Sequence, residues 1–198
     1  MKGDAAGFLK GFSTNTLEAP RNAFVDLKGR IVATFEQKVL DPNEVLIAIE
    51  KSFYKRLQKH LEKYLFLSNT PLEETAYRVY VNLDENFAPI IIDKVLTANA
   101  SQNEFALFRL KNQLPIQGID YDDEMILNVG EKEFISYTKG CYLGQETVAK
   151  VHYRGKPPKK LVVRSEGECS PDEIQRMTSK TCDPETGKVL GFVFISNE

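Results

Sequence analysis

A hairpin signal followed closely by a strongly amphipathic helix constrains the fold of the first third of the chain. Residues from Ala23 to Leu40 alternate around Lys28-Gly29, and glycine suits a tight turn because it readily adopts a positive φ. Apolar side chains then recur at helical spacing from Phe53 to Leu65, opposite a face rich in Lys and Glu. The sequence therefore predicts an antiparallel strand pair packed against a helix, within an α+β fold.

The rest of the chain alternates between short helical and short extended segments. The acidic run from Asp120 to Glu124 is expected to form a solvated turn. Further helices are predicted over 4–12, 104–112 and 147–154, and further strands over 45–49, 76–81, 89–96, 160–164 and 188–195. The elements group into an N-terminal α+β lobe (1–68), a second α+β lobe (69–138), a loop and helix (139–156) and a small C-terminal β unit (157–198).

The composition limits the class of protein. The net charge is −2, so the chain as a whole lacks the electrostatic character of a nucleic-acid-binding protein. No apolar run approaches the roughly 18–20 residues that span a bilayer. The N-terminus has neither the apolar core of a signal peptide nor the Arg-rich character of a transit peptide. We therefore expect a cytoplasmic protein, or a mature form that has already been processed, that does not contact the membrane.

The cysteine pattern indicates free thiols. The three cysteines include no CxxC pair, which fits neither a disulfide framework nor a closed zinc site. Since the chain has only two histidines, we expect no structural metal. Cys169 and Cys182 are expected to be inert.

The segment 137–150 contains the most chemically informative pattern. Two glycines bracket Cys141 and an aromatic residue directly before the predicted helix. A thiol close to a helix N-terminus and to Lys139 lies in positive potential, which favours the thiolate. A thiolate at neutral pH acts as a nucleophile, a redox centre or a soft metal ligand. A lone intracellular cysteine is also commonly a small buried hydrophobe, so both interpretations stay open.

The same segment resembles the signature of a known family. The residues Lys139-Gly140-Cys141-Tyr142-Leu143-Gly144-Gln145-Glu146, with Val148-Ala149-Lys150 and Arg154-Gly155 after them, are similar to the signature of the YgfZ-type folate-binding proteins. Those proteins are known as tRNA-modifying or iron–sulfur cluster maintenance factors and are relatives of the glycine-cleavage T-protein, an aminomethyltransferase. Fainter resemblance lies at residues 3–15, at 28–31 and between Arg109 and Pro115.

The resemblance implies a fold, a cofactor and a site. The fold would be a T-protein-like, multi-lobed α+β structure with a small, shortened C-terminal β-barrel, and the cofactor tetrahydrofolate or a derivative. Cys141 and Lys139 would be the catalytic residues. A pterin ring suits polar and aromatic partners, although Glu146 in a first helical turn also complements the helix dipole. The implied folate contacts are Gly140, Tyr142, Gly144, Gln145, Glu146, Arg109 and Arg154.

Two departures from the family pattern bear on the chemistry. In T-proteins a catalytic Asp follows the first hairpin turn, whereas this chain has no carboxylate after Gly29 until Glu36. Relatives often have a pterin-binding Glu two residues after the arginine that matches Arg109, and this chain has Lys111 there. The first departure argues against aminomethyl transfer, and the second leaves the details of folate binding open.

A basic cluster follows the signature. It surrounds His152, which is expected at the surface or in packing, and it either binds a polyglutamate tail or RNA phosphates or forms an ordinary solvated face. We define this basic cluster as Lys150, Arg154, Lys156, Lys159, Lys160 and Arg164.

Three functions follow from these observations. The leading hypothesis is a folate-binding accessory protein for iron–sulfur cluster assembly or repair that affects tRNA modification indirectly and acts through Cys141. Its partners would be folate and iron–sulfur enzymes or assembly proteins. The alternatives are a folate-dependent aminomethyl or other one-carbon transferase, and a non-catalytic folate-binding or RNA-binding adaptor.

Overall fold

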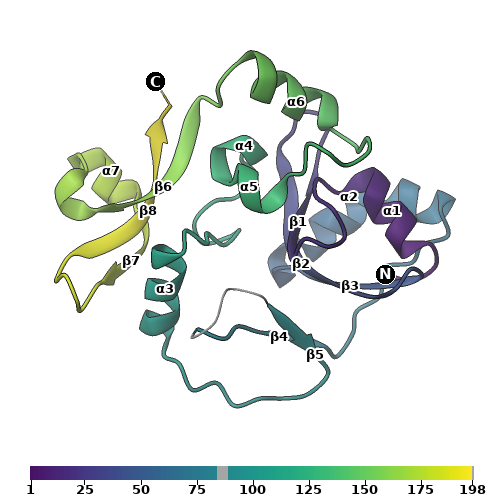
Figure 1. Ribbon diagram of the computed structural model, residues 1–198, viewed down its shortest axis with the longest axis horizontal. Helices are drawn as coiled ribbons and strands as arrows, with labels where there is room; N and C mark the ends of the chain where they lie inside the picture. Colours follow the sequence, from purple (N-terminus) through teal and green to yellow (C-terminus); the bar gives the residue numbers. More distant parts are fainter. Residues whose placement is uncertain (84–88, 198) are drawn as a thin grey trace.

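The computed structural model describes residues 1–83 and 89–197 and shows a mixed α/β protein with three small sheets in those residues (Figure 1). The helices are α1 (Ala5–Phe12), α2 (Tyr54–Leu67), α3 (Gln102–Lys111), α4 (Ile126–Val129), α5 (Glu131–Phe134), α6 (Gln145–Arg154) and α7 (Pro171–Arg176). The strands are β1 (Arg21–Val25), β2 (Ile31–Asp41), β3 (Glu44–Ala48), β4 (Arg78–Tyr80), β5 (Ile90–Ile92), β6 (Lys159–Ser165), β7 (Thr178–Cys182) and β8 (Val189–Ser196). This architecture is compatible with the predicted α+β class.

The predicted hairpin is confirmed as the antiparallel pair β1–β2, which β3 extends to a three-stranded sheet. Gly29 takes a φ of 72° in the turn. The carboxylate of Asp26 accepts hydrogen bonds from the backbone N–H groups of Lys28 and Arg30, at 2.8 and 2.9 Å. The turn therefore depends on two local devices, a glycine with a positive φ and a side chain that satisfies exposed backbone donors.

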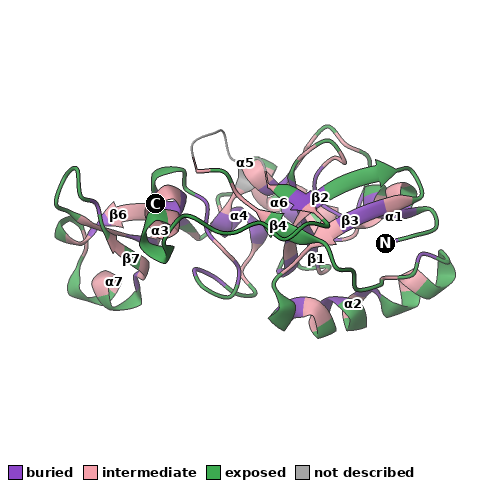
Figure 2. Cartoon of the chain, turned by 90° about the horizontal axis from the view of Figure 1, so that it is seen from below, coloured by how far each residue is buried: buried purple, intermediate pink, exposed green. Residues whose placement is uncertain are grey.

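Strand β1 is buried on both faces and lies between two hydrophobic cores. On one face Phe24 stacks against Phe35 at a ring-centroid distance of 4.7 Å, in the core that α1 and α2 cover. On the other face Ala23 and Val25 belong to a second core, formed with α4, α6 and the C-terminal sheet. In Figure 2, α2 lies along one side of the sheet with an exposed outer face, as its amphipathic sequence predicts.

The predicted helices form where the sequence has capping signals. Asp4 accepts a hydrogen bond from the backbone N–H of Gly7 at 3.0 Å and caps α1. Ser101 and Glu104 form a reciprocal capping box at the start of α3. Helix α6 begins two residues before the predicted start because Gly144, with a φ of 85°, acts as its N-cap.

The middle strands and the C-terminal unit differ from expectation. The strands predicted over 76–81 and 89–96 are reduced to the two-stranded ribbon β4–β5. The prediction of a C-terminal β-barrel is wrong for the described residues. There β6, β8 and β7 form an open antiparallel sheet, and α7 packs against β8. Helix α7 was not predicted, although Ser170-Pro171 followed by Glu173 is a capping-box signal for its start.

The arrangement in Figure 1 brings distant parts of the chain together. The β1–β3 sheet lies on the right, the β4–β5 ribbon below, α3 and the C-terminal sheet on the left, and α6 at the top. None of the helices in the described part of the chain combines the length and the apolar character needed to cross a membrane. The unit boundaries near residues 68, 138 and 156 stay predictions.

Candidate functional site

The segment that contains the signature is docked on the last turn of α1 and on the residues after it. The backbone N–H of Leu143 donates to the carbonyl of Gly11 at 3.0 Å, and that of Ser136 donates to Thr14 at 3.0 Å. These bonds leave Cys141 exposed at the rim of an open cavity of about 480 Å³. The cavity, which we call the thiol cavity, is lined by Lys10, Gly11, Thr16–Glu18, Lys139, Gly140 and Cys141.

Lys139 is half-buried at the inner side of this loop. Its ammonium donates to the backbone carbonyl of Ser13 and lies 5.2 Å from the ring centroid of Tyr142. Burial lowers the pKa of Lys139 to about 8. A large fraction of this amine is therefore neutral in mildly basic solution, and a neutral amine has a lone pair that acts as a base or a nucleophile.

The pKa of Lys139 predicts its reactivity toward acetylating reagents. The neutral fraction should rise through pH 8, where it is about half, whereas an ordinary lysine is only about 0.4% neutral there. Peptide mass spectrometry after brief acetylation should show the Lys139 rate levelling off above about pH 9, while the rates of most surface lysines still increase. Lys10 lines the same cavity and controls for reagent access. A Lys139 rate that keeps rising to pH 10.5 would contradict the prediction.

The other signature residues occupy different environments. Tyr142 is buried beneath Lys139, and burial raises its pKa to about 12. Gln145 is half-buried and Glu146 exposed in the first turn of α6. Arg154 is exposed at the far end of the same helix, roughly 13 Å along the axis from Gln145 at a rise of 1.5 Å per residue. The structure therefore brings Lys139, Gly140 and Cys141 to one cavity and leaves Arg154 distant from it along α6.

Arg109 lines a second cavity, of about 250 Å³, between β1–β2, the β4 region and α3. The guanidinium of Arg21 lies 3.6 Å from the carboxylate of Glu36, directly across the β1–β2 pair. Burial nevertheless raises the pKa of Glu36, because desolvation outweighs the attraction of Arg21. We call this the arginine cavity; its polar lining residues include Arg21, Thr34, Glu36, Arg109 and Gln117.

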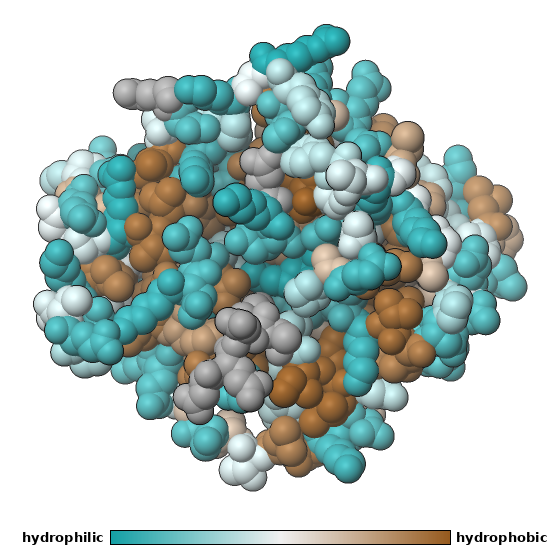
Figure 3. All heavy atoms as spheres, in the orientation of Figure 1, coloured by the Kyte–Doolittle hydropathy of each residue, from teal (hydrophilic) through white to brown (hydrophobic). Residues whose placement is uncertain are grey.

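The sequence-predicted site is thus divided between two cavities. No residue found at the rim of the thiol cavity also lines the arginine cavity in the described part of the chain. Arg21 and Gln117 were not predicted as site residues, and Glu36 was predicted only as the first carboxylate after the turn. For Arg21 and Glu36 the available signal was a charged side chain within an otherwise apolar strand, whereas Gln117 lies outside the strands and had no such signal. Hydrophilic side chains occupy the middle of the face drawn in Figure 3, with hydrophobic side chains gathered in separate patches around it.

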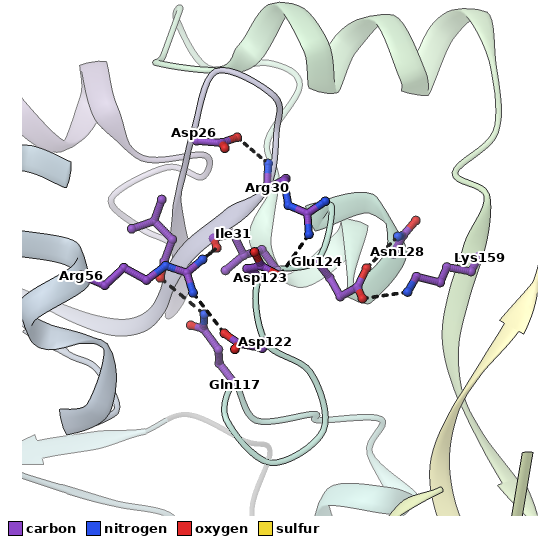
Figure 4. Close-up of polar contacts among 11 residues, drawn as sticks. Asp26, Arg30, Ile31, Arg56, Gln117, Asp122, Asp123, Glu124, Asn128 and Lys159 are labelled. Carbon is purple, nitrogen blue, oxygen red and sulfur yellow. Dashed lines mark hydrogen bonds and ion pairs between the residues drawn. The ribbon is translucent and has the colours of Figure 1, made fainter. Parts of the chain in front are cut away.

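The acidic run from Asp120 to Glu124 was predicted to be a solvated turn, and this prediction is wrong. Asp120 is buried, and the other three acidic residues form ion pairs with different elements (Figure 4). The pairs join the hairpin turn, α2 and β6 to the loop and are Arg30–Asp123 at 3.0 Å, Arg56–Asp122 at 3.1 Å and Lys159–Glu124 at 2.7 Å. The loop therefore holds together segments that are far apart in sequence.

Asp120 connects Arg109 to the C-terminal sheet. One carboxylate oxygen lies 2.6 Å from Nη1 of Arg109 and accepts from the backbone N–H of Ile116 at 2.9 Å. The other accepts from the hydroxyls of Thr178 and Ser179, at 2.8 and 2.6 Å. Since Arg109 also donates to Ser179 at 2.7 Å, its position in the arginine cavity depends on contacts from β7.

Lys111 also faces the C-terminal sheet. Its ammonium lies 2.7 Å from the carboxylate of Glu185 and 3.6 Å from that of Asp183. Lys111, which stands where relatives often have a pterin-binding Glu, is therefore held by ion pairs to the C-terminal unit. Among the described residues, no three His, Cys, Asp or Glu side chains gather in a group that would hold a metal ion.

Comparisons with known proteins give partial matches. No family model matches the chain. The chain is 34% identical over 86 residues to a protein named "tRNA-modifying protein YgfZ" from Colwellia psychrerythraea, covering 41% of this chain and 26% of that protein. It is 24% identical over 179 residues to an uncharacterized protein from Haemophilus influenzae, covering 77% of this chain and 64% of that protein. The chain thus spans less than two thirds of the length of these curated relatives, and the matches support a relationship to YgfZ over part of the chain.

Proposed function

We propose that the protein is a YgfZ-like accessory factor in tRNA modification that binds a reduced folate and acts through the thiol of Cys141. Its effect on tRNA would pass through iron–sulfur enzymes whose clusters it helps to assemble or repair. The observation that carries the proposal is the exposed Cys141 at a cavity rim, beside Lys139 with its lowered pKa, within the signature-like loop. The partial similarity to a protein named as tRNA-modifying supports the same role. The lobes would follow a T-protein-like plan.

The arginine cavity suits the pterin ring of the folate. Its volume of about 250 Å³ is near the lower end of small-molecule sites, and it would take a bicyclic ring rather than the whole cofactor. The carboxyl group of Glu36 offers a partner to the ring N–H and amino groups. Arg109 contributes a buried Nε that has no hydrogen-bond partner in the described part of the protein, and a ring acceptor would satisfy it.

The separation of the cavities favours one role for Cys141. A thiol that lines a different cavity from Glu36 and Arg109 is not placed to attack a one-carbon unit on a pterin held by those residues. An exposed cysteine is instead accessible to a partner protein, and cysteine sulfurs are the usual ligands of iron–sulfur clusters. We therefore favour an accessory role toward a partner over aminomethyl transfer.

The decisive experiment titrates the wild type and three variants with tetrahydrofolate under anaerobic conditions. Glu36→Gln should weaken folate binding by about tenfold, because a strong acceptor beside the ring is lost. Cys141→Ser should keep the folate affinity and abolish iodoacetamide labelling at this position, and it should fail to restore activity of iron–sulfur enzymes in cells that lack the endogenous protein. Glu73→Gln changes an exposed carboxylate outside the arginine cavity and is the matched control.

Two results would contradict the proposal. Absence of saturable tetrahydrofolate binding by the wild type would rule out folate as the cofactor. Full activity of Cys141→Ser in cells would rule out a functional role for the Cys141 thiol and would favour the non-catalytic adaptor.

A further inference from the structure

Three aromatic rings form a cluster at the C-terminal end of α6. Tyr137 stacks on His152 with a centroid distance of 3.9 Å and an interplanar angle of 23°. Tyr153 meets His152 edge-on at 4.5 Å and Tyr137 at 6.0 Å. Tyr137 lies just before the signature and His152 near the end of α6, so the stack joins the two ends of the signature segment. Tyr153 extends the cluster toward solvent.

Tyr153 is far more exposed than packing would require. Helix α6 contacts the core through Val148, which is fully buried, and through the partly buried Val151. Tyr153 remains 70% exposed despite its edge contacts with two other rings. A large ring that is held by neighbours and open to solvent is a platform on which a flat molecule can stack.

The cations around this ring come from the basic cluster. The sequence from Thr147 to Ser165 contains six Lys and Arg residues and no Asp or Glu, in a chain whose net charge is −2. Two cations of the cluster are engaged with acidic partners, Lys159 with Glu124 and Arg164 with Glu173. Three further cations are exposed and lie on α6 or β6: Lys150, Arg154 and Lys160.

We infer that this surface binds an unpaired stretch of RNA. One base stacks on Tyr153, and the phosphates on either side contact the three exposed cations Lys150, Arg154 and Lys160. Aromatic stacking requires a base that is free of its own helix, which loops and single strands of RNA provide. The inference goes beyond the proposed function, because neither the folate nor the thiol is involved, and it gives the protein its own contact with the nucleic acid.

Other anionic partners fit this surface less well. A polyglutamate chain would engage the cations and leave the exposed ring of Tyr153 unused. A membrane surface would need an apolar helix face to insert, but the apolar face of α6 is occupied by Val148 in the core. Both partners are therefore outcomes of the test rather than part of the inference.

The test measures fluorescence anisotropy of a labelled twelve-nucleotide, unstructured oligoribonucleotide over a series of salt concentrations, without folate. Tyr153→Ala should weaken binding by about tenfold with little change in salt dependence. Tyr153→Phe should retain the affinity because the ring remains. The triple variant Lys150→Gln, Arg154→Gln, Lys160→Gln should lower the slope of log affinity against log salt by about 2, since each lost phosphate contact contributes roughly 0.7.

Helix α2 offers matched controls for both changes. Phe66→Ala removes an aromatic ring that is 85% exposed. Lys55→Gln, Lys59→Gln, Lys63→Gln removes three exposed cations from one helix. Neither control variant should alter the RNA affinity or its salt dependence.

Several outcomes would overturn the inference. They are no binding of the oligoribonucleotide by the wild type at low salt, equal losses in the α2 controls, an unchanged affinity of Tyr153→Ala, and equal affinity for a fully paired RNA duplex. Binding to anionic phospholipid vesicles or polyglutamate in place of RNA would assign the surface to that partner instead. Because folate is absent from these assays, their failure leaves the proposed folate function untouched.

Discussion

Asp120→Ala is expected to lower the free energy of unfolding by about 3–5 kcal/mol, because it leaves the buried guanidinium of Arg109 without its counter-charge. The side chain of Asp120 is 0% exposed and that of Arg109 is 6% exposed, with 2.6 Å between the paired atoms. The substitution also removes the acceptor for the hydroxyls of Thr178 and Ser179. Urea unfolding followed by circular dichroism at constant pH measures the effect.

Asp122→Ala is the matched control for this prediction. Asp122 belongs to the same acidic loop and pairs with Arg56 at 3.1 Å, but its side chain is 70% exposed. Solvent screens such a pair, so its loss should cost less than about 1 kcal/mol. Similar losses in the two variants would show that burial does not distinguish the pairs and would contradict the role assigned to Asp120.

Gly144→Ala is expected to destabilise the protein by roughly 2–5 kcal/mol, which combines left-handed backbone strain with overpacking. Gly144 has a φ of 85°, and an added Cβ would lie 2.3 Å from the carbonyl oxygen of Asp26 and 2.9 Å from a methyl group of Val25. The signature loop and the hairpin would have to separate to admit the methyl group. Thermal unfolding of the variant should show a clear decrease in Tm.

Gly140→Ala, within the same signature, is the matched control for this prediction. A Cβ at Gly140 meets no atom within 4 Å, and its φ is not positive. This variant should therefore unfold like the wild type, within about 0.5 kcal/mol. If Gly144→Ala also unfolded like the wild type, that result would contradict the close contact between Gly144 and the hairpin.

Local signals in the sequence predicted much of the secondary structure. The glycine turn at Gly29, the cap at Asp4 and the apolar spacing of α2 each act through residues within one or two turns of one another. Such interactions depend little on the rest of the fold. The hairpin, α1, α2 and α3 were accordingly predicted correctly, whereas the barrel, inferred from resemblance alone, was not.

The acidic loop shows why other features could not be predicted. A run of aspartates and glutamates has the same sequence pattern whether it is solvated or paired. Its partners Arg30, Arg56 and Lys159 lie between 35 and 93 residues away. Only the fold brings them within ion-pair distance. The same applies to Arg21 and Glu36, whose burial in a cavity depends on β4 and α3 as well as on their own strand pair.

The sequence by itself determined the hairpin turn at Gly29 and the presence of α1, α2 and α3, and it identified the glycine-bracketed Cys141 as the residue to examine, because these properties depend on neighbouring residues. The tertiary structure alone decided that Lys139 loses its ordinary pKa, that Arg109 belongs to a different cavity from Cys141, and that Asp120 is buried. Desolvation and ion pairing depend on which distant side chains exclude water from a group, and that information arises only when the chain is folded.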